Sequence, residues 1–160
     1  MGIAQTSYNR NMAMGYPGMI EGLYDECESA MLDEAVGFGL GVVDGAETEA
    51  GTLSSISVKL PDANTDTFRG ITVHEHMENS YPYSSDGVTM PAGHVASIMR
   101  KGKVVVQTDG TVTVGSGTVY VTTAGKFTST EGTNATATGC VFRRAETALN
   151  LALVEVNLPQ

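Results

Sequence analysis

The chain of 160 residues has the length of one compact domain, so we expect a single fold unit. Its 18 Asp and Glu residues against 9 Lys and Arg give a formal net charge of −9. This acidity argues against a direct nucleic-acid partner, because neutralising phosphates requires a basic surface. No apolar run approaches the roughly 18 residues of a membrane span, and the first residues lack the pattern of a secretory signal. We therefore expect a soluble chain without a membrane partner.

The cysteine content points to neither a zinc site nor a disulfide framework. Cys27 and Cys140 lie far apart and have no CxxC spacing. A reducing compartment such as the cytoplasm is the simpler interpretation.

Residues 1–24 have few charges and are rich in methionine and tyrosine, a mixture typical of neither a regular helix nor a regular strand. Pro17 and Gly18 interrupt the pattern. We interpret the segment as an arm that becomes ordered against another surface, since methionine and aromatic side chains adapt to many partners. The alternative, that the arm packs back on its own domain, is equally open.

An acidic segment follows the arm. From Glu21 to Glu49 the chain holds nine acids and no Lys or Arg. The acid pairs here favour solvated surface over calcium binding or acid-base chemistry. Within the segment, residues 35–43 alternate glycine with large apolar side chains, which predicts a strand whose glycine face lies against another backbone. Asp44-Gly45 then predicts a turn.

Short strands dominate the rest of the chain. Asp109-Gly110, between two valine-rich stretches, is typical of a hairpin with a type I′ turn. Only residues 145–149 fit one turn of helix. The expected strands cover residues 53–59, 68–76, 95–99, 103–107, 111–114, 118–122, 139–143 and 149–158.

These patterns predict an all-β fold, either a single compact barrel or a jelly-roll-like β-sandwich, with an extended N-terminal arm. Both architectures limit the exposed sheet edges of short strands. We divide the chain into an arm at residues 1–24 and a β-rich domain at residues 25–160. Residues 77–93 are expected to form the longest surface loop.

No motif indicates catalysis. His74, Glu75 and His76 could place two imidazoles on one side of a strand, but a recognisable third metal ligand is missing, so solvent-facing polar residues are favoured. Gly115-Ser116-Gly117 is a tight reversal rather than a nucleophile elbow, which requires a strand-to-helix turn. We therefore expect no catalytic residue, no metal and no cofactor.

Basic residues are few and concentrated. In so acidic a chain they could face an acidic patch on a neighbouring copy or on a partner, or could simply keep turns soluble. The candidate oligomer or lattice contacts are Arg100, Lys101, Lys103, Arg143 and Arg144.

The order of several short motifs along nearly the whole chain, from about Gln5 to Leu158, resembles the small capsid cement, or decoration, proteins of tailed bacteriophages. The most informative part is a Gly-Phe-Gly run, a Gly-Ile-x-Val about thirty residues later, and a basic glycine-containing stretch before a valine strand. The motifs are residues 5–8, 17–20, 36–43, 68–73, 100–106, 113–121, 125–127 and 152–156.

The resemblance implies a non-enzymatic, β-rich virion protein that forms a homo-oligomer, with a trimer favoured and a dimer as the second choice. It implies a place on the outer surface of the capsid, after synthesis in the cytoplasm of the bacterial host. There the protein would bridge neighbouring major capsid protein subunits and oppose expansion of the shell under the pressure of packaged DNA. The arm residues that we expect at the capsid or partner interface are Tyr8, Met12, Met14, Tyr16, Pro17, Met19 and Ile20.

Two alternatives remain at this point. The chain could be another virion component, in the tail, the baseplate or the coat. It could also be a small metal-binding jelly-roll enzyme that uses His74, Glu75 and His76.

Overall fold

The computed structural model describes residues 15–23, 25–46, 56–74, 83–84, 87–115, 117–131, 135–136 and 139–159. These residues form strands joined by turns and one 3₁₀ turn, η1 (Thr147–Leu149). The strands are β1 (Glu26–Leu32), β2 (Val36–Gly37), β3 (Gly41–Asp44), β4 (Ser57–Lys59), β5 (Phe68–Thr72), β6 (Tyr83–Ser84), β7 (Gly87–Met90), β8 (Val95–Gln107), β9 (Tyr120–Val121), β10 (Phe127–Thr128), β11 (Ala135–Thr136), β12 (Cys140–Glu146) and β13 (Leu151–Asn157).

A closed barrel forms one half of the molecule. Its strands follow the order β1, β4, β3, β5 and β8, and the ring closes because the first half of β8 pairs with both β5 and β1. The β1–β4 pair is parallel and the other pairs are antiparallel. Closure leaves no open edge in this ring. The all-β prediction with a barrel is therefore confirmed.

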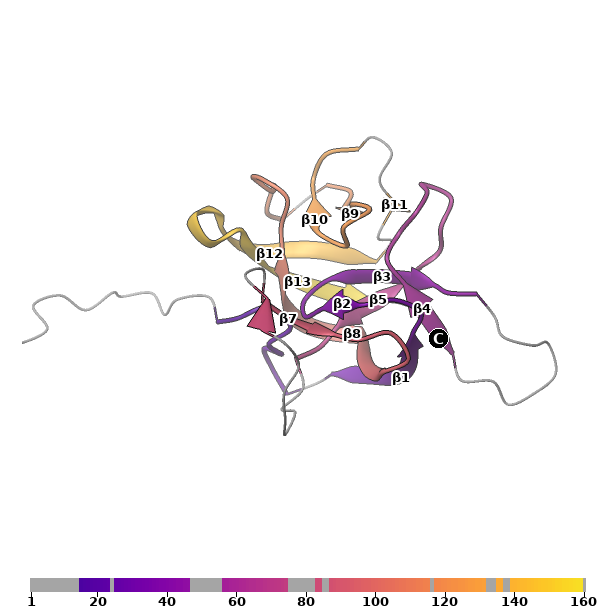
Figure 1. The fold of residues 1–160 in the computed structure, drawn as a ribbon. Helices are drawn as coiled ribbons and strands as arrows, with labels where there is room; N and C mark the ends of the chain where they lie inside the picture. The colour runs from indigo at the N-terminus through magenta and orange to yellow at the C-terminus, as the bar shows by residue number, and fades with distance from the viewer. Residues whose placement is uncertain are drawn as a thin grey trace, which may run out of the picture.

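Strand β8 joins the barrel to a second layer. It bends at Gly102, whose φ of 133° lies in the region that favours glycine, and its second half pairs with β13, which pairs with β12. In Figure 1 the small sheet of β9, β10 and β11 lies above β12 and β13, on one face of this extension. The long strand thus places a barrel and a sandwich-like unit side by side.

Each half has its own hydrophobic core. Leu32, Val42 and Ile98 belong to the barrel cluster and are almost fully buried. Val104, Val154 and Phe127 belong to a larger cluster where the β8–β13–β12 layer meets the small sheet. The alternating side chains of β8 and β13 supply both sides of their layer, as the period of a strand requires.

The expected strand over residues 35–43 is wrong, because the chain turns at Phe38-Gly39 and forms β2 and β3 instead. Gly39 has a φ of 67°, and a Cβ there would lie 2.7 Å from the Gly18 nitrogen and 2.9 Å from the Val105 oxygen. The close approach of a glycine to another backbone was thus predicted correctly, but it occurs at a turn.

Residues 77–93, expected as the longest surface loop, contain the paired strands β6 and β7. The strands expected at residues 95–99 and 103–107 are present but are not separate, and a predicted hairpin is wrong. Residues 95–99 and 103–107 form the single strand β8, so Arg100 and Lys101 lie within a strand rather than in a turn. The Asp109-Gly110 hairpin is absent: Asp109 donates its N–H to the Phe127 oxygen, and residues 111–114 form no strand. Among the described non-glycine residues only Asn150 has positive φ, which rules out a type I′ turn at Asp109.

Candidate functional site

The end of the predicted arm lies on the free edge of β8. The Gly18 N–H donates to the Val105 oxygen at 2.7 Å, the Val105 N–H donates to the Met19 oxygen at 2.9 Å, and the Glu21 N–H donates to the Lys103 oxygen at 2.8 Å. Residues 18–21 therefore extend the sheet on the side opposite β13, and we call them the arm root. For this part of the arm, packing on its own domain is what the structure shows.

Side chains of the arm root point to both faces of the layer. Ile20 packs against the larger core, whereas Met19 packs against Val105, Leu151 and Leu153 on the opposite face. Tyr8, Met12 and Met14, the other apolar arm residues expected at the interface, lie outside the described residues. Whether any of these side chains contacts a capsid stays a prediction.

Tyr16 and Pro17 precede the arm root and form one wall of a groove. The Tyr16 ring lies 4.7 Å from the His74 ring in an edge-on arrangement, and the Phe38 ring lies 4.7 Å from His74 on another side. The backbone N–H of His74 donates to the backbone oxygen of Gly18 at 2.9 Å. These contacts fix the exit of the arm against the barrel.

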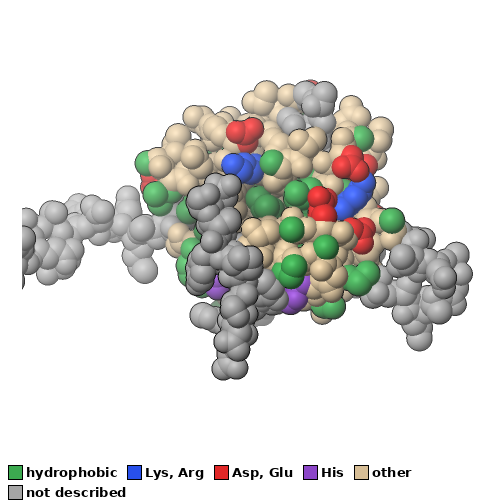
Figure 2. All heavy atoms as spheres, viewed as in Figure 1, with side chains coloured by type: hydrophobic (Ala, Val, Ile, Leu, Met, Phe, Trp, Pro, Cys, Tyr) green, Lys and Arg blue, Asp and Glu red, His purple; other side chains and the backbone are tan. Residues whose placement is uncertain are grey.

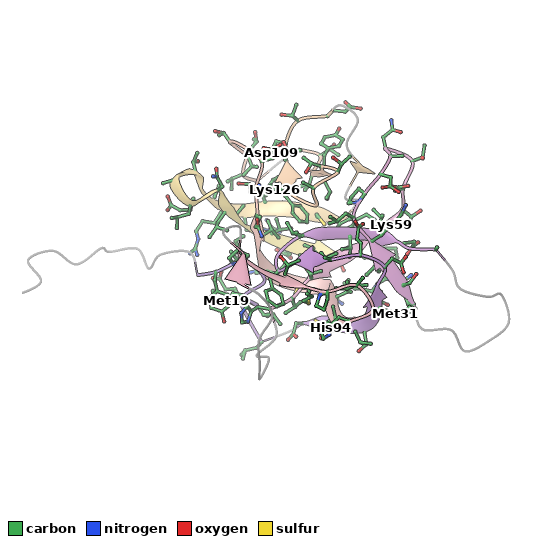
Figure 3. The ribbon with its side chains drawn as sticks, in the orientation of Figure 1. Met19, Met31, Lys59, His94, Asp109 and Lys126 are labelled. Carbon is green, nitrogen blue, oxygen red and sulfur yellow. The ribbon has the colours of Figure 1, made fainter. Side chains whose placement is uncertain are left out.

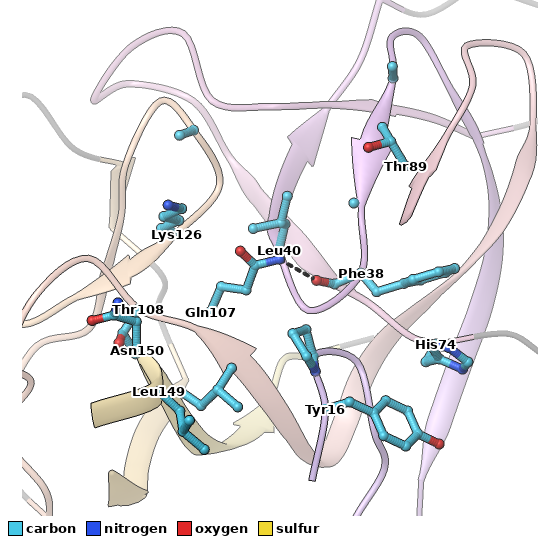
Figure 4. A pocket seen from close by; sticks show the side chains of 15 residues that line it. Tyr16, Phe38, Leu40, His74, Thr89, Gln107, Thr108, Lys126, Leu149 and Asn150 are labelled. Carbon is cyan, nitrogen blue, oxygen red and sulfur yellow. Dashed lines mark hydrogen bonds between the residues drawn. The ribbon is translucent and has the colours of Figure 1, made fainter. Parts of the chain in front are cut away.

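The groove itself is open and has a volume of about 970 Å³. Figure 4 shows that its lining comes from distant parts of the chain, with Tyr16 and His74 at one end and Lys126, Leu149 and Asn150 at the other. The Gln107 side chain of β8 donates to the Phe38 oxygen at 3.0 Å and so connects the two ends of the groove. We call this site the arm-side groove.

The face of the β8–β13–β12 layer that points away from the larger core, on which Met19 also packs, carries four of the five predicted basic residues, and we call it the outer face. Lys101 and Lys103 flank Gly102 on β8 and are exposed, and Lys103 lies opposite Glu155 of β13. Arg143 and Arg144 are exposed at the bulge in edge strand β12.

Ion pairs run across this face. The Arg143 Nε lies 2.7 Å from the Glu155 carboxylate, and the Arg144 guanidinium lies 4.0 Å from the carboxylate of Glu21. Such exposed pairs contribute little stability on their own. The bulge and its two arginines also blunt the free edge of β12 against pairing with other strands.

Arg100 has a different role from the other predicted basic residues. Its guanidinium donates to the Pro159 oxygen at 2.7 Å and lies 3.3 Å from the Glu28 carboxylate. Glu28 also accepts two hydrogen bonds from Arg69, at 2.5 and 2.9 Å. Partial burial pushes the pKa of Glu28 upward, but the hydrogen bonds and charges of Arg69 and Arg100 outweigh it and hold the pKa below its usual value. The sequence analysis did not single out Glu28 and so missed this bridge.

The described residues offer little for catalysis. They contain no group of three His, Cys, Asp or Glu that could hold a metal ion. Burial raises the pKa of the Cys140 thiol to about 12, so that thiol stays protonated at neutral pH. Glu75 and His76 lie outside the described residues, and no described helix is long and apolar enough to cross a membrane.

The acid pair at Asp33 and Glu34 serves the fold. Asp33 accepts hydrogen bonds from the Ala46 N–H at 3.1 Å and the Ser57 hydroxyl at 3.2 Å, and Glu34 accepts one from the Leu60 N–H at 2.8 Å.

Figure 2 shows basic side chains lying beside acidic ones on one face of the molecule, so the described part of that face has no continuous basic patch.

A family model described as structural cement protein (E217 gp24/Pam3 gp6) matches residues 4–157. Among solved structures, the chain is similar to a chain in the capsid of Myoviridae phage XM1, with 20% sequence identity, a TM-score of 0.66 and coverage of 96% of each chain; this likeness shows the fold. No curated protein matches. The tail, baseplate, coat and metal-enzyme alternatives gain no support here. Because the family model spans nearly the whole chain, the protein belongs to the structural cement protein family of phages, and its role is to cement a phage capsid.

Proposed function

We propose that this protein binds the outer surface of a phage head and bridges neighbouring major capsid protein subunits, with the residues before the arm root, 1–17, as one anchor. The observation that carries the proposal is the arm root: three backbone hydrogen bonds fix residues 18–21 to β8, so the residues before them start from a rigid point. Tyr16 is 46% exposed beside this point. A rigid start lowers the entropy lost when an anchor is ordered on a partner.

The arm is long enough to reach a neighbouring subunit. Fully extended, residues 1–14 span up to about 50 Å, whereas a domain of this length has a radius of gyration of about 15 Å. Large apolar side chains such as Tyr8 and Met12 would supply most of the affinity, since a few well-buried anchors dominate most interfaces. Added main-chain pairing would fix the register.

Cementing follows from binding only the assembled shell. A protein that binds the intact lattice and not its separated subunits stabilises the lattice by RT ln(1 + [L]/Kd) at each site. A homo-oligomer would strengthen this effect, because one bound copy raises the effective concentration of the others. We propose a trimer, with a dimer as the second choice, and the candidate contacts between copies or with the lattice are Lys101, Lys103, Arg143 and Arg144 on the outer face. The function requires no catalytic group.

The acidic character of the chain suits an outer position, because a surface with a net charge of −9 is repelled by DNA phosphates. Synthesis in the cytoplasm of the host, before the virion is complete, is part of the same proposal.

Removing residues 1–14 tests the anchor. The deletion spares Tyr16, Pro17 and the arm root, so the variant should fold with an unchanged circular dichroism spectrum. In co-sedimentation with expanded heads that lack this protein, we expect the deletion to lose most binding. A variant whose residues 1–14 are replaced by a Gly-Ser segment of equal length should behave like the deletion. Full binding by both variants would remove the arm from the proposal.

A further inference from the structure

The arm-side groove gathers apolar side chains that the fold leaves exposed. Tyr16 is 46% exposed and Leu149 is 54% exposed, and both line it. Phe38, Leu40 and Leu151 lie in the same lining and are buried. Exposed large apolar residues that share a concave site mark an interaction surface, whereas isolated ones do not.

The charges of the groove indicate what kind of segment it accepts. Lys126 is the only Lys or Arg in the lining, and none of the lining residues is Asp or Glu, although acids outnumber bases two to one in the whole chain. Within the described residues Lys126, which is labelled in Figure 3, forms no ion pair. A carboxylate on an incoming segment would meet attraction here without a competing acid in the lining.

The position of the groove indicates which molecule supplies that segment. Tyr16 belongs to its wall, and the residues before Tyr16 are the proposed anchor. Tyr16 and Pro17 are expected interface residues and also line the groove, so a subunit that contacts them lies beside the groove, and both contacts can act on that one partner. Two linked weak contacts release far more slowly than either alone.

We propose that the arm-side groove binds an extended apolar segment of the shell subunit next to the arm, with an Asp or Glu of that segment at Lys126. Apolar side chains of the segment pack against Tyr16 and Leu149, and the aromatic contacts of Tyr16 and Phe38 with His74 hold that wall in place. The proposal rests on the proposed function for the identity of the partner. It adds a second docking site and the chemistry of its ligand.

Paired substitutions test the groove in the full-length protein. Leu149→Asp and Lys126→Glu should each weaken binding to heads that lack this protein by about tenfold, equivalent to about 1.4 kcal/mol. Val114→Asp and Lys59→Glu are the matched controls, because Val114 is 47% exposed, which is similar to the 54% of Leu149, and neither control residue lines the groove. Both controls should bind like the wild type, and Lys126→Arg should retain wild-type affinity because it keeps the charge.

The outcomes separate the two proposals. If the wild type binds heads and the groove variants bind as well as the controls, the groove is not a docking site. If Lys126→Glu and Lys126→Arg are weakened equally, shape rather than charge governs the site and the carboxylate ligand is wrong. If the wild type fails to bind heads at all, the proposed function is wrong, and the proposal that the groove binds a segment of the shell subunit is wrong as well.

Discussion

Two glycines determine how the arm root meets the barrel. Gly39 approaches the backbone of Gly18 and Val105 at the turn between β2 and β3, and Gly18, with a φ of 81°, would place a Cβ 2.5 Å from the His74 nitrogen. Both have positive φ and no room for a side chain. At this junction four chain segments meet through main-chain atoms, so the fold tolerates no other residue at Gly18 or Gly39 without a shift.

Gly39→Ala should therefore destabilise the protein more than an alanine at an open glycine with the same backbone conformation. Strain at positive φ costs about 1–2 kcal/mol in either case, and at Gly39 the collision with two backbone segments adds to it. Gly110→Ala is the control, because Gly110 has a φ of 77° and open space around it. Urea unfolding of both variants measures the difference. Equal losses would mean that the junction relaxes freely.

Glu28 shows how a single carboxylate can join three strands. It lies on β1 and holds Arg69 of β5 and Arg100 of β8, and Arg100 in turn holds the Pro159 oxygen near the C-terminus. Because the folded-state pKa of Glu28 lies below its ordinary value of 4.5, its contribution to stability is present above that value and is lost as the pH falls through the folded pKa.

Glu28→Gln should lower the free energy of unfolding at pH 7. The difference in free energy of unfolding between the variant and the wild type should become smaller as the pH falls below about 4.5. Urea unfolding at pH 7 and at pH 3 measures this. Glu155→Gln is a suitable control, because the Arg143–Glu155 pair is more exposed and should contribute little at either pH. A gap for Glu28→Gln that stays constant with pH would contradict the role assigned to this bridge.

Among the elements, β8 has the most partners. It closes the barrel through β1 and β5, carries β13 beyond Gly102, and accepts the arm root on its remaining edge. The edge of β8 left over after barrel closure would otherwise expose unpaired backbone groups. The arm root is therefore part of the sheet, and only the residues before it are available to reach a neighbour.

Deleting residues 1–21 should distinguish the contribution of the arm root to stability from that of the residues before it. Unlike removal of residues 1–14, it eliminates the arm-root hydrogen bonds and the packing of Met19 and Ile20. We expect a loss of about 2 kcal/mol, which is the lost burial and bonding less the entropy of ordering the segment. The thermal midpoint should fall by about 6 °C, whereas the shorter deletion should leave it unchanged. Equal midpoints would show that the arm root adds nothing to stability.

At the scale of the whole molecule, a barrel and a sandwich-like layer share one strand and present two different surfaces. The outer face carries alternating charges, and the arm-side groove carries exposed apolar side chains beside one cation. A cement must touch more than one neighbour, and two unlike surfaces on a rigid body allow that without any movement of the fold.

Stabilisation of heads should depend on the concentration of this protein. Under the proposed function the lattice binds this protein and dispersed subunits do not, so each tenfold increase in its free concentration above Kd adds about 1.4 kcal/mol for every site. The temperature at which DNA-filled heads release their genome should therefore rise with the logarithm of the free protein concentration, also above the concentration that fills the sites. DNA release at a temperature independent of added protein would contradict a cementing role in these heads.

Local patterns in the sequence were sufficient for the fold class. The alternation along residues 149–158 predicted β13, and turn residues between short β-branched runs predicted an all-β chain, because both signals depend only on neighbours in sequence. The order of short motifs along the chain was sufficient to indicate the family. The structure brings the basic residues at 101, 103, 143 and 144 onto one face, and their contact with other copies or with the lattice stays a prediction.

Tertiary structure alone decided what lies opposite what. Glycine alternation at residues 35–43 fits a strand and a turn equally well, and the approach of the arm root at Gly39 selected the turn. Asp109-Gly110 favours a hairpin locally, but in the structure the Asp109 N–H donates to the Phe127 oxygen, which is distant in sequence. Barrel closure, the Glu28 bridge and the arm-side groove each join segments far apart in the chain. Such contacts depend on register and packing of the whole core, which no short window of sequence contains.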